Sequence, residues 1–246
     1  MPLLLGNATR ISKYLIEHDK IYEVRLKFGI KTDTADIEGN VIKQEEIPSF
    51  SDIELKKILN SFVGEQFQTP PIYSALKVNG KKLYEYARCG EDVEIKPRKI
   101  KIYSIDFEGY NDKEGELDFK VSVSKGTYIR SLCEDIAERL NTVGYMKELK
   151  RIKVGRFEIS DSIRVEQLEK NIDDLDFLKK NIITIEEIFK NNLNIELDND
   201  EMQKFLNGVK LKNCNKDGVY KIYNQDRQFI GLGTILDGML KRDVIV

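Results

Sequence analysis

Residues 117–140 contain one abrupt change of hydrophobic period, and this change constrains the fold more than any other feature of the chain. Apolar and polar residues alternate over residues 117–123, as in a strand with one buried face. Gly126 ends the alternation, and from Arg130 onward the apolar residues recur at the spacing of an amphipathic helix. The sequence therefore predicts a strand that leads directly into a helix.

Tyr128 and Arg130 lie at the junction of this strand and helix. In a structural interpretation, Tyr128 closes the core and Arg130 pairs with a helical acid such as Glu134. In a functional interpretation, both side chains belong to a site, because binding residues are concentrated on the connections between elements. These residues alone leave both interpretations open, and the structural one ranks first until other segments are considered.

The rest of the chain predicts a mixed α and β protein. The predicted elements are a helix over residues 8–18, a strand over 22–28, a helix that starts at Ser51 and buries Ile53, Ile58, Leu59 and Phe62, a tight turn at 78–81, a helix over 83–88, helical segments over 165–170 and 183–190, and strands over 218–223, 229–233 and 244–246. Met146 and Leu149 are helically spaced and are candidates for the core.

Length and composition place the chain among globular proteins. Its 246 residues, 41% of them hydrophobic, suffice for one large or two small domains. No apolar run approaches the ~18–20 residues of a membrane helix, and the apolar start lacks the basic region of a signal peptide, so we expect a cytoplasmic protein. The three cysteines and the single histidine show no zinc spacing, so we expect free thiols and no metal site.

The net charge of −2 is distributed unevenly along the chain. Residues 161–201 carry 12 acids and 5 bases, so the remainder is net basic. Two basic clusters occur, at residues 77–88 and 147–156. Such clusters are usually solvated surfaces, and they would form a phosphate-binding surface only if the fold brought them to one side.

Four separated segments together resemble the bacterial TruB-type tRNA pseudouridine synthases. The segments are Leu5–Arg10; Asp19–Tyr22 with Gly29–Asp36 and Gly39; Pro70–Lys77 with Gly80, Tyr84, Ala87 and Arg88; and Lys125–Arg130. Their order and spacing agree with the family from the start of the chain to about residue 160. Any one of these motifs would be weak support, but four in register indicate the family strongly.

The resemblance implies an α+β fold in which a mixed, mainly antiparallel central sheet is flanked by helices. It implies a pseudouridine synthase catalytic domain over residues 1–180, with its N-terminal part missing, and a small β-rich, PUA-like RNA-binding domain over residues 181–246. The implied activity is isomerisation of the T-loop uridine, position 55 of tRNA, to pseudouridine. The implied partner is the T-stem-loop of tRNA, with no metal, organic cofactor or membrane, and we expect a monomer.

The resemblance also assigns roles to single positions. Tyr22 would stack on the extruded base, and Arg130 would pair with the family's nucleophilic carboxylate, which a nearby guanidinium keeps ionised. The implied substrate-binding residues are Tyr128, Leu149, Asp36, Tyr73, Ser74, Lys77, Lys20 and Lys125. The residues implied to contact RNA phosphates are Lys81, Lys82, Lys150 and Arg151.

Several of these positions have a structural alternative. Tyr22 shares a predicted strand face with apolar residues and could be core, as could Leu149. Asp36 lies in a loop of turn-forming residues and could simply stabilise the turn. Lys150 stands where the family more often has arginine, and lysine lacks the bidentate fork that arginine offers a phosphate.

The family's nucleophile has no counterpart in the sequence. In the family, a Gly-x-Leu-Asp-Pro stretch precedes the segment that resembles Pro2–Gly6 and supplies the catalytic aspartate, whereas Leu-Asp-Pro occurs nowhere in the 246 residues. We therefore expect a start placed too far downstream or a truncated chain, with an exposed sheet edge and no pseudouridylation activity. We expect Arg130 to turn to solvent or to find a substitute acid, because an unpaired buried cation is costly.

Three functions stay open. The first is the tRNA pseudouridine synthase with its amino terminus lost. The second is a catalytically silent tRNA-binding or folding-assistance protein, and the third is an α/β interaction module whose motifs are structural. The guide-RNA-dependent pseudouridine synthases of archaea and eukaryotes share the core motifs, but the short tail argues against them.

Overall fold

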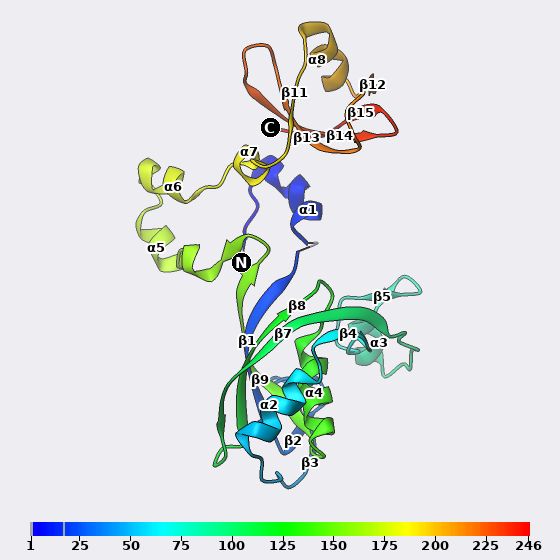
Figure 1. Ribbon diagram of the computed structural model, residues 1–246, viewed down its shortest axis with the longest axis vertical. Helices are drawn as coiled ribbons and strands as arrows, with labels where there is room; N and C mark the ends of the chain where they lie inside the picture. The colour runs from blue at the N-terminus through cyan, green and yellow to red at the C-terminus, as the bar shows by residue number, and fades with distance from the viewer. Residues whose placement is uncertain (1, 17) are drawn as a thin grey trace. The chain divides into compact units, whose positions relative to one another are not determined.

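The computed structural model describes residues 2–16 and 18–246. The chain forms two compact units, a larger unit of residues 17–161 and a smaller unit that combines residues 1–16 with 162–246 (Figure 1). We expected a boundary near residue 180. In this division the acidic helical segments group with the C-terminal part of the chain, and the expected domain boundary at residue 180 stays a prediction.

A six-stranded antiparallel sheet forms the larger unit. Its strands are β1 (Lys20–Phe28), β4 (Gly64–Gln68), β7 (Arg98–Asn111), β8 (Glu116–Val123), β9 (Gly144–Val154) and β10 (Phe157–Glu158), in the order β10-β9-β1-β8-β7-β4. Strand β1 is paired with β8 on one side and with β9 on the other. The strands predicted over residues 22–28 and 117–123 are confirmed.

One face of this sheet carries the hydrophobic core of the larger unit. The core packs β1, β7 and β8 against helices α2 (Asp52–Asn60) and α4 (Ile129–Arg139) (Figure 1). Leu26, Phe119 and Ile136 are completely buried, and each such side chain stabilises the fold by ~1.5–3 kcal/mol. The helical stripe predicted from residue 130 onward is therefore confirmed.

Helix α2 begins where the sequence predicts, and of the predicted apolar residues Leu59 and Phe62 are buried and Ile58 packs against the core, whereas Ile53 does not. The Ser51 hydroxyl caps it by accepting a hydrogen bond from the N–H of Glu54 at 3.2 Å. Leu55 and Leu59, four residues apart, are buried, whereas Ile53 is 80% exposed. The prediction for Ile53 was wrong because positions four apart share a helix face and Ile53 lies outside the face that Leu55 and Leu59 define.

Two hairpins and a short helix complete the larger unit. They are β2 (Ile30–Thr32) with β3 (Val41–Gln44), β5 (Lys77–Val78) with β6 (Lys81–Lys82), and α3 (Leu83–Cys89), and a 3-10 turn η2 (Ile159–Asp161) follows β10. Asn79 and Gly80 have positive φ angles of 52° and 83°, the geometry of the predicted tight turn. Gly90, with a φ of 65°, ends α3 as predicted.

Residues 144–154 form strand β9, so the helical interpretation of Met146 and Leu149 was wrong. Strand β9 pairs with β1 through two register shifts, one beside Tyr22 and one beside Arg25. Each shift lets two residues of β9 face one residue of β1, which disguises the alternation of a strand in the sequence. Leu149 is 43% exposed and is not part of the core.

The smaller unit is built on a five-stranded sheet. Its strands are β11 (Asn194–Glu196), β12 (Leu211–Lys212), β13 (Gly218–Tyr223), β14 (Phe229–Leu236) and β15 (Met239–Ile245), in the order β11-β13-β14-β15-β12. Its helices are α5 (Val165–Lys170), α6 (Leu175–Asn181), α7 (Ile185–Ile188) and α8 (Asn199–Leu206). The strands predicted over 218–223 and 229–233 are confirmed, and the third predicted strand begins earlier, at Met239.

The N-terminal segment packs on this second sheet. Instead of one helix over residues 8–18, it forms a 3-10 helix, η1 (Gly6–Ile11), and a short α1 (Ser12–Ile16). Ile11 is completely buried in a cluster with Val244, and the Tyr14 hydroxyl donates a hydrogen bond to Asp243. Among the described helices, none is both long and apolar enough to span a bilayer.

Candidate active site

The corner between β8 and α4 is the centre of the candidate site. Gly126 turns the chain with a φ of 79°, a conformation that glycine adopts without strain. Ser124 exchanges two hydrogen bonds with Lys101 of the neighbouring strand β7: its N–H donates to the Lys101 carbonyl, and its hydroxyl accepts from the Lys101 N–H, both at 2.8 Å. The corner is therefore fixed to the sheet, and it determines where Tyr128 and Arg130 begin the helix.

Arg130 connects three segments at this corner. Its Nη1 donates to Oδ2 of Asp36 at 2.9 Å and to the carbonyl oxygen of Thr34 at 3.3 Å. Its Nη2 donates to the carbonyl oxygen of Tyr73 at 2.7 Å. The side chains of Arg130 and Asp36 are 23% and 19% exposed, so the pair is largely shielded from water. Three of the four motif segments thus meet at one guanidinium.

These contacts identify the acid that pairs with Arg130. The expectation that Arg130 finds a substitute acid is confirmed, and the acid is Asp36. The alternative pairing with Glu134 was wrong, because Glu134 forms an ion pair with Lys31 at 3.2 Å. Tyr128 is the half-buried N-cap residue of α4.

The loop that contains Asp36 is held by hydrogen bonds within the loop and by one to strand β9. Oδ1 of Asp36 accepts hydrogen bonds from the Thr34 hydroxyl at 2.6 Å and from the Glu38 N–H at 3.2 Å. The carbonyl of Ala35 accepts from the N–H of Met146 on β9 at 3.0 Å, which anchors the loop to the sheet. Asp36 therefore forms a turn, as the structural alternative predicted, and also holds Arg130.

The segment after β4 contributes Tyr73, Ser74 and the lysine hairpin. The Ser74 carbonyl accepts from the N–H of Tyr84, which ties the segment to α3. The Ser74 hydroxyl is buried and has no hydrogen-bond partner among the described residues. Lys81 pairs with Glu91 at 2.9 Å, and Lys82 donates to the Tyr84 hydroxyl at 3.2 Å.

Tyr22 and Leu149 lie on the same face of the sheet. In the pairing of β1 with β9, Val24 is opposite Leu149 and Tyr22 is opposite Arg151, and opposed residues of antiparallel strands point to the same side. Tyr22 is half-buried and packs against the core on the helix-covered face. It lies across from Val121, two residues before β8 ends, and so at the end of the sheet where the corner forms.

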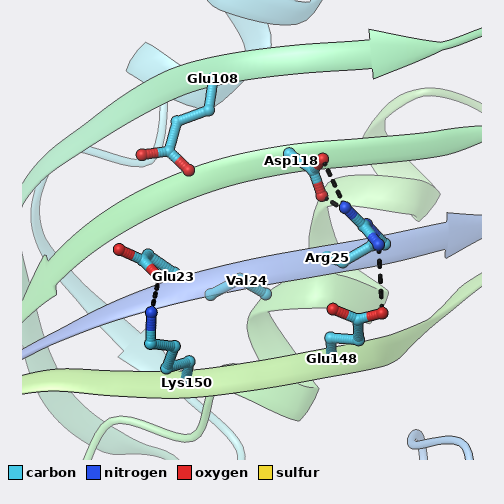
Figure 2. Close-up of a pocket in the computed structure, with 7 residues that line it drawn as sticks. All are labelled: Glu23, Val24, Arg25, Glu108, Asp118, Glu148 and Lys150. Carbon is cyan, nitrogen blue, oxygen red and sulfur yellow. Dashed lines mark hydrogen bonds and ion pairs between the residues drawn. The ribbon is translucent and has the colours of Figure 1, made fainter.

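Lys150 lies on the opposite face of the sheet from Arg151. Figure 2 shows Lys150 pointing toward Glu23, and their ion pair measures 3.0 Å. A pocket on this face is lined by four carboxylates and two cations, from Glu23, Glu108, Asp118, Glu148, Arg25 and Lys150. Lys147 and Lys153 also pair with carboxylates, so the lysines of the 147–156 cluster do not form one free basic surface.

The remaining lysines of the predicted set are dispersed. Lys20 donates from Nζ to the carbonyl of His18 at 2.7 Å, at the start of β1. Lys77 is exposed at the base of the β5–β6 hairpin, and Lys125 is exposed in the turn before α4. No three His, Cys, Asp or Glu residues among those described are grouped as a metal site would require.

Gln68 is a residue of this corner that the sequence analysis missed. It is 5% exposed, and its amide forms two hydrogen bonds with the backbone of Tyr128, at 2.8 and 3.0 Å. In the sequence, Gln68 stands directly before Thr69 and a proline pair, which disrupt strand pairing and so indicate the end of a strand. Strand β4 was not predicted, so the sequence did not show that the Gln68 side chain points into the protein.

The comparison with protein families covers nearly the whole chain. Residues 1–129 match the N-terminal domain of the TruB family pseudouridylate synthases. Residues 130–190 match the tRNA pseudouridylate synthase B C-terminal domain, and residues 194–244 match the C-terminal domain of pseudouridine synthase II TruB.

Individual proteins agree with the family match. The tRNA pseudouridine synthase B of Clostridium kluyveri is 41% identical over 247 residues, which cover 98% of this chain and 83% of that protein. That of Aquifex aeolicus is 37% identical and covers 97% and 82%. A solved chain from a Cbf5-Nop10-Gar1 complex superposes with a TM-score of 0.64 at 19% identity, covering 98% of this chain and 69% of that one. The expected α+β fold is confirmed.

Proposed function

The chain belongs to the TruB family of pseudouridine synthases, and on this premise we propose that it binds the T-stem-loop of tRNA and receives the uridine at position 55, the substrate for isomerisation to pseudouridine. The observation that carries the proposal is the contact of Arg130 with Asp36 and Tyr73, because it joins three segments that match the family's motifs. An isomerisation neither adds nor removes atoms, so its stoichiometry requires no cofactor.

The base would be held by aromatic and apolar side chains. A uridine in a folded loop must be extruded from its stack, which costs a few kcal/mol. Stacking on Tyr22 would offset part of that cost, since base–aromatic stacking contributes ~1–3 kcal/mol. Tyr128 at the corner would provide further contacts to the base, as would Leu149, which lies on the same face of the sheet as Tyr22. The exposure of Leu149 supports a role in binding rather than in the core.

The polar edge of the uracil and its ribose would be met by the groups around Arg130. A guanidinium carries five N–H donors, and the Asp36 carboxylate keeps it in one orientation. The Ser74 hydroxyl can both donate and accept, and it has no hydrogen-bond partner among the described residues, which supports its use by a ligand. Lys20, Lys125 and Tyr73 are the remaining members of the proposed substrate-binding set.

The phosphates of the RNA would be met by the β5–β6 hairpin and by Arg151. Lys77, Lys81 and Lys82 lie on two short adjacent strands. Among the described residues, the ion pair that opposes their charges is that of Lys81 with Glu91. Lys150 is retained as a candidate, although its pairing with Glu23 reduces the charge available. The affinity for RNA should fall steeply as the salt concentration rises, because lysines that bind phosphates displace the counterions of the RNA.

We assign residues 1–180 the catalytic role and residues 181–246 the role of a PUA-like RNA-binding domain, in a monomeric cytoplasmic protein. The family match supports the C-terminal assignment, since residues 194–244 match a TruB C-terminal domain. The 246 residues contain no Leu-Asp-Pro, and both Asp36 oxygens accept hydrogen bonds. These residues by themselves should therefore bind the uridine without isomerising it.

Binding and turnover are tested separately with one RNA. The 246 residues are titrated with a T-stem-loop at low and moderate salt, and the same mixture is analysed for pseudouridine by mass spectrometry after chemical labelling. We expect binding that weakens with salt and no pseudouridine. Absence of binding at low salt would contradict the proposed function, whereas turnover would contradict only the inactivity of these residues.

A further inference from the structure

Gln68 is a buried amide at the end of β4, the edge strand of the larger sheet. Its Oε1 accepts a hydrogen bond from the N–H of Tyr128 at 2.8 Å, and its Nε2 donates to the carbonyl oxygen of the same residue at 3.0 Å. One side chain thus satisfies both backbone polar groups of a single residue. Buried backbone groups need such partners because an unpaired one destabilises the fold.

Tyr128 is the residue at which the chain changes from extended to helical. It has φ −97° and ψ 112°, and its own side chain makes no capping hydrogen bond to α4. Its carbonyl also accepts the first helical hydrogen bond, from the N–H of Leu132 at 3.1 Å. Gln68 therefore fixes the start of the helical turn from which the Arg130 side chain extends.

Two further contacts continue this pairing beyond Gln68. The Ser131 hydroxyl donates to the carbonyl of Thr69 at 3.2 Å, and Arg130 donates to the carbonyl of Tyr73. Residues 68–73 and the first turn of α4 are joined at three places. Of these three contacts, the one from Gln68 acts on the backbone of Tyr128 and uses no proposed uridine-binding side chain.

The chemistry of this contact suits glutamine in particular. A carboxamide carries an acceptor and a donor side by side, matching one backbone N–H and one carbonyl. Glutamate has the same length but, when ionised, has no donor, and methionine has the length with neither group. Asparagine carries the same amide group, but its side chain is one methylene shorter than that of glutamine.

We propose that Gln68 is a positioning residue of the uridine site, which acts by holding the backbone of Tyr128 and thereby the direction of Tyr128 and Arg130. The inference rests on the proposed function and names a determinant of it. It predicts that loss of the Gln68 amide harms recognition of the base more than recognition of the RNA backbone.

The first test measures amide hydrogen exchange by NMR. In the unsubstituted chain, the Tyr128 amide should exchange at least about 100-fold more slowly than an amide of an exposed turn such as Lys125. Gln68→Met should remove this protection at Tyr128 and leave the β1 amides protected. A Tyr128 amide that exchanges as fast as that of Lys125 in the unsubstituted chain would overturn the proposal without any variant.

The second test compares two T-stem-loops, one with the target uridine and one with an abasic residue in its place. Gln68→Met and Gln68→Glu should each weaken binding of the uridine RNA about tenfold and of the abasic RNA less than about twofold. The matched control is Gln66→Met, on the same strand, because Gln66 donates to the Phe62 carbonyl at 3.2 Å and does not contact the corner.

The outcomes are distinguishable from a failure of the proposed function. Equal losses on both RNAs, or an equal loss for Gln66→Met, would show a general structural effect and refute the positioning role. If the unsubstituted chain binds neither RNA, the proposed function fails, and the exchange experiment still decides whether Gln68 holds Tyr128.

Discussion

Two arginines of the larger unit, Arg25 and Arg130, are both held by hydrogen bonds but have different kinds of partner. Arg25 donates to both oxygens of Asp118, at 2.7 and 3.0 Å, and to Glu148 at 3.1 Å (Figure 2). The hydrogen bonds to Asp118 raise the pKa of Arg25 further above its usual value. Arg130 has one carboxylate partner, Asp36, and two backbone carbonyls.

This difference separates a sheet-stabilising arginine from a site-organising one. The partners of Arg25 stand on the adjacent strands β8 and β9, so it reinforces a pairing that the backbone already fixes. The partners of Arg130 lie in two loops far apart in sequence, and Arg130 itself links these loops through its hydrogen bonds. The several carboxylates around Arg25 also repel the phosphates of RNA, whereas the one carboxylate that pairs with Arg130 only balances the charge of that arginine.

The largest difference is expected when each arginine is replaced by methionine. Arg130→Met should weaken binding of the uridine stem-loop about 10- to 100-fold, since hydrogen bonds to charged groups contribute ~1.5–3 kcal/mol and three segments lose their link. Arg25→Met should leave the affinity within about twofold. Fluorescence anisotropy at fixed salt measures both.

Thermal unfolding provides the complementary measurement. Arg25→Met should lower the free energy of unfolding by about 1 kcal/mol, a value kept small because its side chain is 34% exposed. If Arg25→Met reduced affinity as much as Arg130→Met did, the distinction between the two arginines would not stand.

A smaller effect is expected from the acid that holds Arg130. Asp36→Asn keeps an acceptor for the Thr34 hydroxyl but places a neutral amide against the guanidinium, so uridine-dependent binding should fall about 3- to 10-fold. Asp33→Asn is the matched control in the same loop, because the Asp33 carboxylate accepts hydrogen bonds from Asn40 within that loop and does not pair with Arg130 in the described structure. Titrations of both variants against the uridine and abasic RNAs measure the effect.

Two results would contradict this expectation. Equal affinity of Asp36→Asn and the unsubstituted chain would mean that Arg130 is oriented by the carbonyls alone. A comparable loss for Asp33→Asn would mean that the loop acts through its fold rather than through the ion pair.

Residues 117–140 show why part of this fold could be predicted from the sequence. Their alternation and helical spacing directly reflect which side chains are buried, and β8 and α4 appear with bounds within a few residues of those expected. The same logic failed for β9, where two register shifts break the alternation and Met146 and Leu149 fall at helical spacing by coincidence. Local periodicity reports burial only when the pairing is regular.

The residues of the candidate site could be predicted only where they lie in a segment that resembles a family motif. Tyr128, Arg130, Asp36 and Tyr73 were singled out by the resemblance, and the structure brings Arg130, Asp36 and Tyr73 together. The sequence predicted that Arg130 would need an acidic partner, but it did not identify Asp36. The two residues are 94 positions apart, and a contact over that distance in sequence is set by tertiary packing. Gln68 was missed for the same reason.

The smallest effect concerns the neighbouring cations Lys150 and Arg151, which point to opposite sheet faces. Arg151→Ala should weaken binding about threefold and reduce the magnitude of the salt slope by about 1, as for loss of one phosphate contact. Lys150→Ala should weaken binding and reduce the slope by less than Arg151→Ala does, because Lys150 pairs with Glu23 on the carboxylate-rich face. Affinities at four salt concentrations measure the slope, and a reduced slope for Lys150→Ala with an unchanged one for Arg151→Ala would reverse the assignment of the RNA-binding face.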